Sequence, residues 1–325
     1  MPHAEFGALR RLSARLGRDI EQVQASGGNT SIKSGDVMWV KASGLWLADA
    51  DDDDVFVPVD RGKVLAAIDA TSEQAVLASV IAGQNARGLR PSIETSMHAL
   101  LDHEIVIHTH SVRTIALAIR ADAKQQLGQR LDGEDWAFIP YYKPGMDLTR
   151  GIASVLGHHP SGRRARILVL GNHGLVVGAS TAEEAGSIID RVERKLDAPL
   201  LAGESDVPDR APPGSAPVAD RLAQSLAVVP GLRKLALGGS YYPDHVVFLG
   251  PAAATEPGGP SKLLLTADGA FLPDDASGSA QAMASCLAHV LARLPGHAEL
   301  RRLSIDEELA LMDWDAEKYR QQLER

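Results

Sequence analysis

Residues 104–110 read Glu-Ile-Val-Ile-His-Thr-His, an apolar run that ends in polar side chains. This pattern predicts a buried strand over these residues. His108 and His110 lie two positions apart, so their side chains share one face of the strand, with Cα atoms roughly 7 Å apart. Two imidazoles at that spacing can bind a single divalent metal, with Zn–N distances of ~2.0 Å. A pair of surface or packed histidines would show the same pattern, so a metal site needs further ligands.

A second apolar run, Arg166-Ile-Leu-Val-Leu170, predicts a central strand, and Gly171-Asn-His-Gly174 follows it. His173 therefore stands where a strand ends, which is where functional residues of α/β sheets concentrate. A plain turn histidine beside a permissive glycine is the alternative. Glu94 lies one turn inside a predicted helix that begins near Pro91, where the helix dipole favours a carboxylate. A simple capping carboxylate would occupy the same position.

Two turn-prone segments could hold an anion: Ser26-Gly-Gly-Asn-Thr-Ser31 and Ala42-Ser-Gly44. Backbone N–H groups and short hydroxyls in such turns bind phosphate without lysine or arginine. Neither segment has the Gly-Lys-Ser/Thr ending of a P-loop, and no Gly-x-Gly-x-x-Gly follows a strand. A nicotinamide-binding domain is therefore poorly supported, and two ordinary turns remain the alternative.

The composition restricts the classes of function. The 325 residues carry a net charge of −9, which argues against a general nucleic-acid binder or a binder of anionic membranes. Cys286 is the single cysteine, so an intrachain disulfide is excluded and a cytoplasmic protein is expected. No apolar run reaches the ~18 residues of a membrane span, and the amino-terminal segment lacks the features of a secretory signal.

The chain divides at a segment rich in proline, residues 203–217, which predicts a linker. Residues 1–202 are expected to form the domain that carries the motifs described above, with helices over 72–88 and 111–130. Residues 218–325 are expected to form a smaller α/β unit. Its predicted elements are helices at 218–227 and 279–293, strands at 245–249 and 262–266, and a terminal helix from Ile305.

Taken together, the motifs resemble the class II aldolase/adducin family over roughly residues 5–200. The order and spacing match as well as the letters, and the nearest subgroup is the aldolase part of bifunctional rhamnulose-phosphate aldolase/dehydrogenases. Residues 218–325 contain nothing like the dehydrogenase part. The segments that carry the resemblance are Ser26–Ser31, Ala42–Gly44, Pro91–Glu94, His108–Ser111, Leu170–Leu175 and Glu183–Ala185.

The resemblance implies a three-layer α/β/α fold around a central mixed sheet, in a homotetramer with active sites near subunit interfaces. It implies Zn²⁺ or another divalent metal held by His108, His110 and His173, with Glu94 as the catalytic carboxylate. Ile93 replaces a serine of many phosphate-using members, which removes one hydroxyl donor. The implied substrate- and phosphate-binding positions are Gly28, Asn29, Thr30, Ser43, Gly44 and Ser92.

The family also places a catalytic tyrosine after an Ile-Pro segment. Here Ile139-Pro140 precedes Tyr141 and Tyr142, and Tyr142 is the expected proton donor, with Lys143 as an alternative cation in the same loop.

The expected reaction is metal-dependent aldol cleavage of a ketose, and the substrate is expected to be phosphorylated. A metal held by neutral imidazoles keeps its full charge and would stabilise the enediolate as it forms, while Glu94 moves the proton. The same scaffold also serves decarboxylases, 4-epimerases and dehydratases of sugar-acid or sugar phosphates. An adducin-like interaction protein without catalysis is the alternative from another class. Residues 218–325 are expected either to pack on the catalytic domain or to act as an interaction module.

Overall fold

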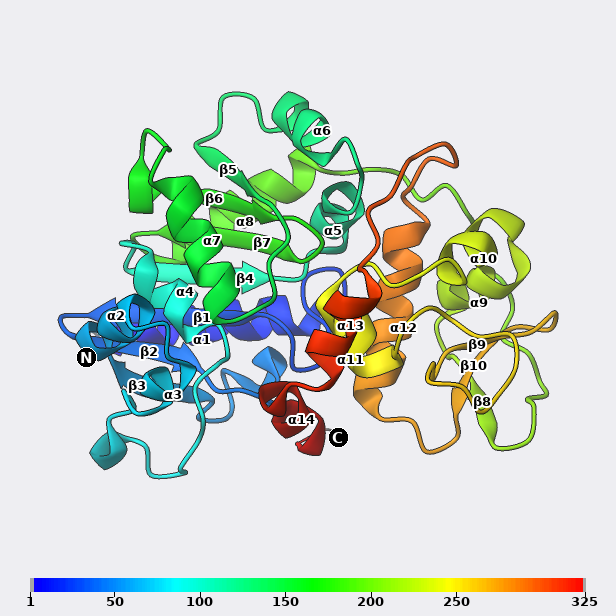
Figure 1. Ribbon diagram of the computed structural model, residues 1–325, viewed down its shortest axis with the longest axis horizontal. Helices are drawn as coiled ribbons and strands as arrows, with labels where there is room; N and C mark the ends of the chain where they lie inside the picture. Colours follow the sequence, from blue (N-terminus) through cyan, green and yellow to red (C-terminus); the bar gives the residue numbers. More distant parts are fainter. Residues whose placement is uncertain (1–2, 324–325) are drawn as a thin grey trace.

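The computed structural model describes residues 3–323, and its centre is a mixed β-sheet (Figure 1). Within these residues, seven strands lie in the order β3-β2-β1-β4-β7-β6-β5, with β5 and β6 parallel and every other neighbouring pair antiparallel. The strands are β1 Asn29–Ser34, β2 Val37–Lys41, β3 Phe56–Asp60, β4 Ile105–Thr109, β5 Trp136–Ile139, β6 Ile167–Leu170 and β7 Gly174–Ala179.

Helices cover both faces of this sheet. Alternation along β4 shows the two layers, because Ile105 and Ile107 pack into one core while Val106 packs into the other. The helices of the first face are α1 His3–Arg18, α6 Ala123–Arg130 and α8 Ala182–Lys195, and those of the second are α2 Arg61–Asp69, α4 Thr95–Leu100 and α7 Met146–Leu156. The expected three-layer α/β/α architecture with a mixed sheet is confirmed.

The same alternation decides which side chains meet. His108 follows Val106 by two residues and so faces α4. In the antiparallel pairing of β1 with β4, Asn29 lies opposite His108. Asn29, His108 and the amino-terminal end of α4 therefore converge on one side of the sheet.

The carboxy-terminal region forms a smaller α/β unit beside the sheet (Figure 1). Its strands β8 Ser215–Pro217, β9 Leu264–Leu265 and β10 Ala270–Pro273 form a three-stranded sheet. Its helices are α9 Arg221–Val228, α10 Pro230–Ala236, α11 Pro243–Leu249, α12 Gly278–Leu291, α13 Ile305–Met312 and α14 Asp315–Gln322.

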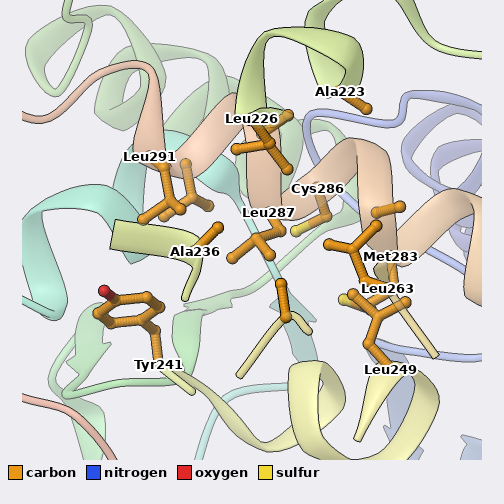
Figure 2. Packing of buried hydrophobic residues seen from close by; sticks show 14 of the residues in the cluster. Ala223, Leu226, Ala236, Tyr241, Leu249, Leu263, Met283, Cys286, Leu287 and Leu291 are labelled. Carbon is orange, nitrogen blue, oxygen red and sulfur yellow. The ribbon is translucent and has the colours of Figure 1, made fainter. Parts of the chain in front are cut away.

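The core of this unit is continuous with the region that contains the seven-stranded sheet. Leu287, Cys286 and Met283 of α12 belong to one buried apolar cluster with Leu226 and Tyr241 (Figure 2). The same core includes Val112, Ile115, Ala116 and Ile119, which lie on or directly after α5 Val112–Ala118. The carboxy-terminal unit therefore packs on the first region through a shared apolar core.

Several local predictions were wrong. Residues 245–249 form helix α11 rather than a strand, because Pro243 supplies a pre-formed first helical turn and Gly250, at φ +84°, ends the helix. The helix predicted over 72–88 is only α3 Glu73–Leu77, followed by a 3₁₀ turn at Ala82–Gln84. The helix predicted over 111–130 is two helices, α5 and α6.

Within the described chain, no helix combines the length and apolar character needed to cross a bilayer. The segment predicted as a linker, 203–217, contains strand β8 at its end.

Candidate metal and catalytic site

Three histidine rings from two parts of the chain meet where the central strands of the sheet end. The ring centroids of His108 and His110 lie 4.9 Å apart, and that of His173 lies 4.9 Å from His108 and 5.2 Å from His110. All three side chains are buried. His108 lies on β4, His110 just after it, and His173 in the turn that joins β6 to β7.

The turn that carries His173 is held by its neighbour. Asn172 adopts a left-handed backbone conformation, φ +54°, which asparagine tolerates better than most residues. Its side-chain amide donates hydrogen bonds to the carbonyl oxygens of Tyr241 and Arg301, both at 2.9 Å. The carboxy-terminal unit therefore anchors the turn from outside the sheet.

The hydrogen-bond partners define which ring nitrogens are free. Nδ1 of His108 lies 2.9 Å from the carbonyl oxygen of Leu175, which can only accept, so this nitrogen carries the proton. Nδ1 of His110 lies 3.0 Å from the carboxylate of Asp244, which likewise accepts. In the neutral rings, both Nε2 atoms therefore present lone pairs, yet they face each other at 3.1 Å. Burial lowers the pKa of His108 and favours its neutral form.

Two lone pairs at this distance are favourable only around a cation or a shared proton. In a tetrahedral zinc site with Zn–N of ~2.0–2.1 Å, two ligand nitrogens are separated by about 3.3 Å. His108, His110 and His173 offer ligand atoms within 4.8 Å of one another. The donor set and its spacing thus fit a divalent metal.

The Glu94 carboxylate adjoins this position. Oε2 lies 3.3 Å from Nε2 of His108, and Oε1 lies 3.5 Å from Nε2 of His173. Glu94 occupies the N-cap position of α4, its side chain makes no capping hydrogen bond, and it is buried. Burial raises its pKa, but His108, His173 and a 2.8 Å hydrogen bond from Nδ2 of Asn29 outweigh burial and lower the pKa to about 2. The carboxylate is therefore ionised at neutral pH.

A buried hydrogen-bond chain behind Glu94 was not predicted from the sequence. His98 contacts Oδ1 of Asn29 through Nε2 and Oγ of Ser31 through Nδ1. Burial lowers the pKa of His98 to about 3, so the ring is neutral and orients the Asn29 amide toward Glu94. The available signal was the spacing: His98 follows Glu94 by four residues and so lies on the same helix face.

Most of the predicted substrate positions line one small cavity with the histidines. The cavity has a volume of about 20 Å³ and is bordered by Gly28, Asn29, Ser43, Gly44 and Ser92. Oγ of Ser43 is buried and makes no hydrogen bond to the described residues. Oγ of Ser92 accepts from the backbone N–H of Glu94 at 3.2 Å.

Two predicted residues point elsewhere. The hydroxyl of Thr30 lies 2.8 Å from that of Ser13 on α1, on the opposite face of the sheet from Asn29. The ring of Tyr142 packs over Gly151, where a Cβ atom would come within 2.3 Å of it. Within residues 3–323, neither Tyr141 nor Tyr142 lines the cavity.

Four charged residues that line the cavity were also missed: Lys41, Asp244, Glu317 and Arg320. The Lys41 amine donates to the carbonyl oxygens of Ser26 and Gly28 at 2.6 and 3.1 Å, and burial lowers its pKa to about 7. Lys41 thus fixes the glycine-rich turn that precedes β1.

Helix α14 contributes Glu317 and Arg320 to the wall of this cavity. Leu323 occupies the space beside Gly44, where an added Cβ would come within 2.6 Å of it. The guanidinium of Arg90 lies 4.2 Å from the ring centre of Tyr319. A second cavity, of about 490 Å³, is bordered by Ser43 and Ser92, which it shares with the small cavity, and by Trp314 and Tyr319.

Comparisons with known proteins agree with the motifs. The family model described as Class II Aldolase and Adducin N-terminal domain matches residues 9–198. A curated relative, "Uncharacterized oxidoreductase YuxG" of Bacillus subtilis (strain 168), is 29% identical over 205 residues, which is 56% of this chain. The chain spans only 28% of that relative's length.

Solved structures give weaker likenesses. The N-terminal class II aldolase domain of a Thermoplasma acidophilum protein is 25% identical with a TM-score of 0.48, over 58% of this chain and 92% of the other. An L-fuculose 1-phosphate aldolase is 20% identical with a TM-score of 0.43, over 60% and 84%. YgbL of Klebsiella pneumoniae, a putative aldolase/epimerase/decarboxylase, is 19% identical with a TM-score of 0.41, over 60% and 87%.

Proposed function

Because the chain belongs to the class II aldolase and adducin family, we propose that it is a metal-dependent enzyme that cleaves a ketose phosphate by an aldol reaction. The observation that carries the proposal is the convergence of His108, His110 and His173 beside an ionised, buried Glu94. An adducin-like interaction protein without catalysis would have no need of this arrangement.

Each residue has a distinct role in this proposal. His108, His110 and His173 would hold Zn²⁺ or another divalent cation, whose positive charge stabilises the negative charge that develops beside the substrate carbonyl. Glu94 takes up and returns the proton of the substrate hydroxyl. Asn29, itself oriented by His98, donates to Glu94 and holds the carboxylate in place.

The phosphate of the substrate is proposed to bind at the turns around the small cavity. Gly28 and Gly44, both at positive φ, allow their backbones to approach closely, and Ser43 and Ser92 supply hydroxyls. Ser43 is well suited because its buried Oγ makes no hydrogen bond to the rest of the described chain.

The substrate needs more room than the cavity offers. A volume of about 20 Å³ holds little more than one water molecule. A ketose phosphate therefore requires α14, with Glu317, Arg320 and Leu323, to move away from the turns that it covers.

Tyr142 remains the proposed proton donor only if it acts in the site of another subunit. Its ring packs within its own chain against Gly151, away from the histidines. In the proposed homotetramer, Tyr142 would serve the site of a neighbouring copy.

Replacement of Glu94 tests the mechanism. Glu94→Gln should retain metal and lower turnover at least ~10²-fold, the lower end of a general-base contribution. Glu104→Gln, an exposed residue that precedes β4, is the matched control and should be unchanged. A Glu94→Gln enzyme with wild-type turnover would remove Glu94 from the mechanism.

Product analysis with a panel of ketose phosphates and sugar-acid phosphates identifies the reaction. Two carbonyl fragments indicate an aldolase, whereas carbon dioxide, an inverted stereocentre or loss of water indicates a decarboxylase, epimerase or dehydratase of the same family.

A further inference from the structure

The histidine cluster receives a carboxylate from outside the family domain. Asp244 lies on α11, beyond the matched residues 9–198, and its Oδ2 lies 3.0 Å from Nδ1 of His110. Both side chains are buried, at 3% and 6% exposure. Polar groups buried in a protein interior are normally hydrogen-bonded, and this contact supplies a partner to both side chains.

The amino-terminal turn leaves room for this contact. A Cβ atom on Gly27 would come within 2.7 Å of Oδ2 of Asp244 and 2.8 Å of Nδ1 of His110. Any larger residue at this position would press the carboxylate and the imidazole apart. The glycine of the Ser26–Ser31 segment thus serves the contact as well as the turn.

The charge of Asp244 is compensated from α14. Nη1 of Arg320 lies 3.2 Å from Oδ1 of Asp244, and Nη2 lies 3.4 Å from Oδ2. Nη1 also donates to both oxygens of Glu317 at 2.9 Å. A buried carboxylate without such a partner would be costly. The contacts to Arg320 and His110 therefore give both oxygens of this buried carboxylate a polar partner.

A carboxylate acceptor at Nδ1 has two effects on His110. It holds the proton on Nδ1 and leaves the Nε2 lone pair directed toward His108, and it fixes the orientation of the ring. It also makes the imidazole a stronger electron donor, as carboxylates behind metal-bound histidines do.

We propose that Asp244 is a positioning residue of the metal site, so that the carboxy-terminal unit sets the affinity for the divalent cation through His110. The inference rests on the proposed function only in that the three histidines bind a metal. It assigns residues 218–325 a role in the site besides packing. A merely structural role for Asp244, as an anchor for Arg320 and α14, is the competing explanation.

Metal affinity separates these explanations. We expect Asp244→Asn to weaken Co²⁺ and Zn²⁺ binding about 10- to 100-fold, the usual effect of losing such a partner. Affinity is measured by titration against a chelator of known affinity, and the Co²⁺ absorption bands report the ligand geometry. Asp268→Asn, an exposed aspartate between β9 and β10 with the same loss of charge, is the matched control.

A second variant moves Asp244 away from His110 without replacing either residue. Gly27→Ala should also weaken metal binding, because the added methyl group displaces Asp244 from His110. If Asp244→Asn and Gly27→Ala bind metal as tightly as the wild type, and lose only stability toward urea, the positioning role is refuted.

A spectroscopic measurement on the unaltered chain covers the case in which the variants do not fold. In the zinc-loaded protein labelled with ¹⁵N-histidine, we expect His110 to carry its proton on Nδ1 and the metal on Nε2. The opposite arrangement would overturn the inference while leaving the metal-dependent function intact. Failure of the wild type to bind any divalent metal would refute both.

Discussion

The junction between the two regions contains a titratable group whose effect on stability can be worked out. His289 of α12 lies between two carboxylates: Nδ1 is 3.3 Å from Glu21, and Nε2 is 3.6 Å from Asp220. Glu21 belongs to the segment that follows α1. Protonated His289 therefore forms an ion pair between the carboxy-terminal unit and the region that contains the seven-stranded sheet. Asp220 and Glu21 raise the pKa of His289 to about 9, against the opposing effect of burial.

The direction of the pH dependence follows from this pKa. The folded protein binds the proton more tightly than the unfolded chain, whose histidine titrates near ~6.5. The stabilisation is therefore fully present below about pH 6.5 and is lost as the pH rises through 9. A rise of the pKa from 6.5 to about 9 corresponds to at most about 3 kcal/mol. Because the site is partly open to solvent, screening reduces this figure, and we expect about 1–2 kcal/mol.

The assay is urea unfolding of the wild type and His289→Gln at pH 6 and pH 9.5. The variant should be less stable than the wild type at pH 6 by about 1–2 kcal/mol, and the difference should shrink to a few tenths at pH 9.5. His297→Gln, an exposed histidine just after the same helix, should match the wild type at both values. A difference between wild type and His289→Gln that is the same at both pH values would refute the charged bridge.

Four other variants test the site and the core. His173→Ala should lose bound metal and activity together, measured by elemental analysis and turnover, whereas the exposed His158→Ala should lose neither. Ser43→Ala should raise KM for a phosphorylated ketose and leave that for its unphosphorylated analogue unchanged; an equal change in both would contradict phosphate binding at Ser43. Leu323→Ala should weaken the cover and speed the loss of metal to a chelator, and an unchanged rate would show that α14 does not limit access. Leu287→Ala, in the core of Figure 2, should cost about 2–5 kcal/mol of unfolding free energy by urea denaturation; a loss below about 1 kcal/mol would show that this core is not tightly packed.

The histidine cluster illustrates how far local patterns reach. The apolar runs before His108 and before His173 form strands β4 and β6 of one sheet. Both strands end on the same side of the sheet, so the histidines that follow lie close together. The pairing of β1 with β4 then places Asn29 opposite His108, which follows from the same strand patterns once their register is known.

Patterns failed where a short apolar run fits more than one element. The run His245-Val-Val-Phe-Leu249 was interpreted as a strand, although Pro243 at the start of a helix was the stronger signal. The resemblance implied Thr30 together with Asn29 as a binding position, but neighbouring residues of a strand point to opposite faces, and the Thr30 hydroxyl faces Ser13.

The sequence by itself indicated the family, because contiguous motifs carry the resemblance, and the resemblance implied the layered α/β fold. It also predicted His108, His110, His173 and Glu94 as site residues, because each lies in one of these motifs. Only the tertiary structure showed that Asp244 and Arg320 complete the surroundings of His110, and that α14 closes the cavity. These contacts join residues far apart in the chain through packing of α11 and α14, and no local periodicity encodes which buried charges will meet.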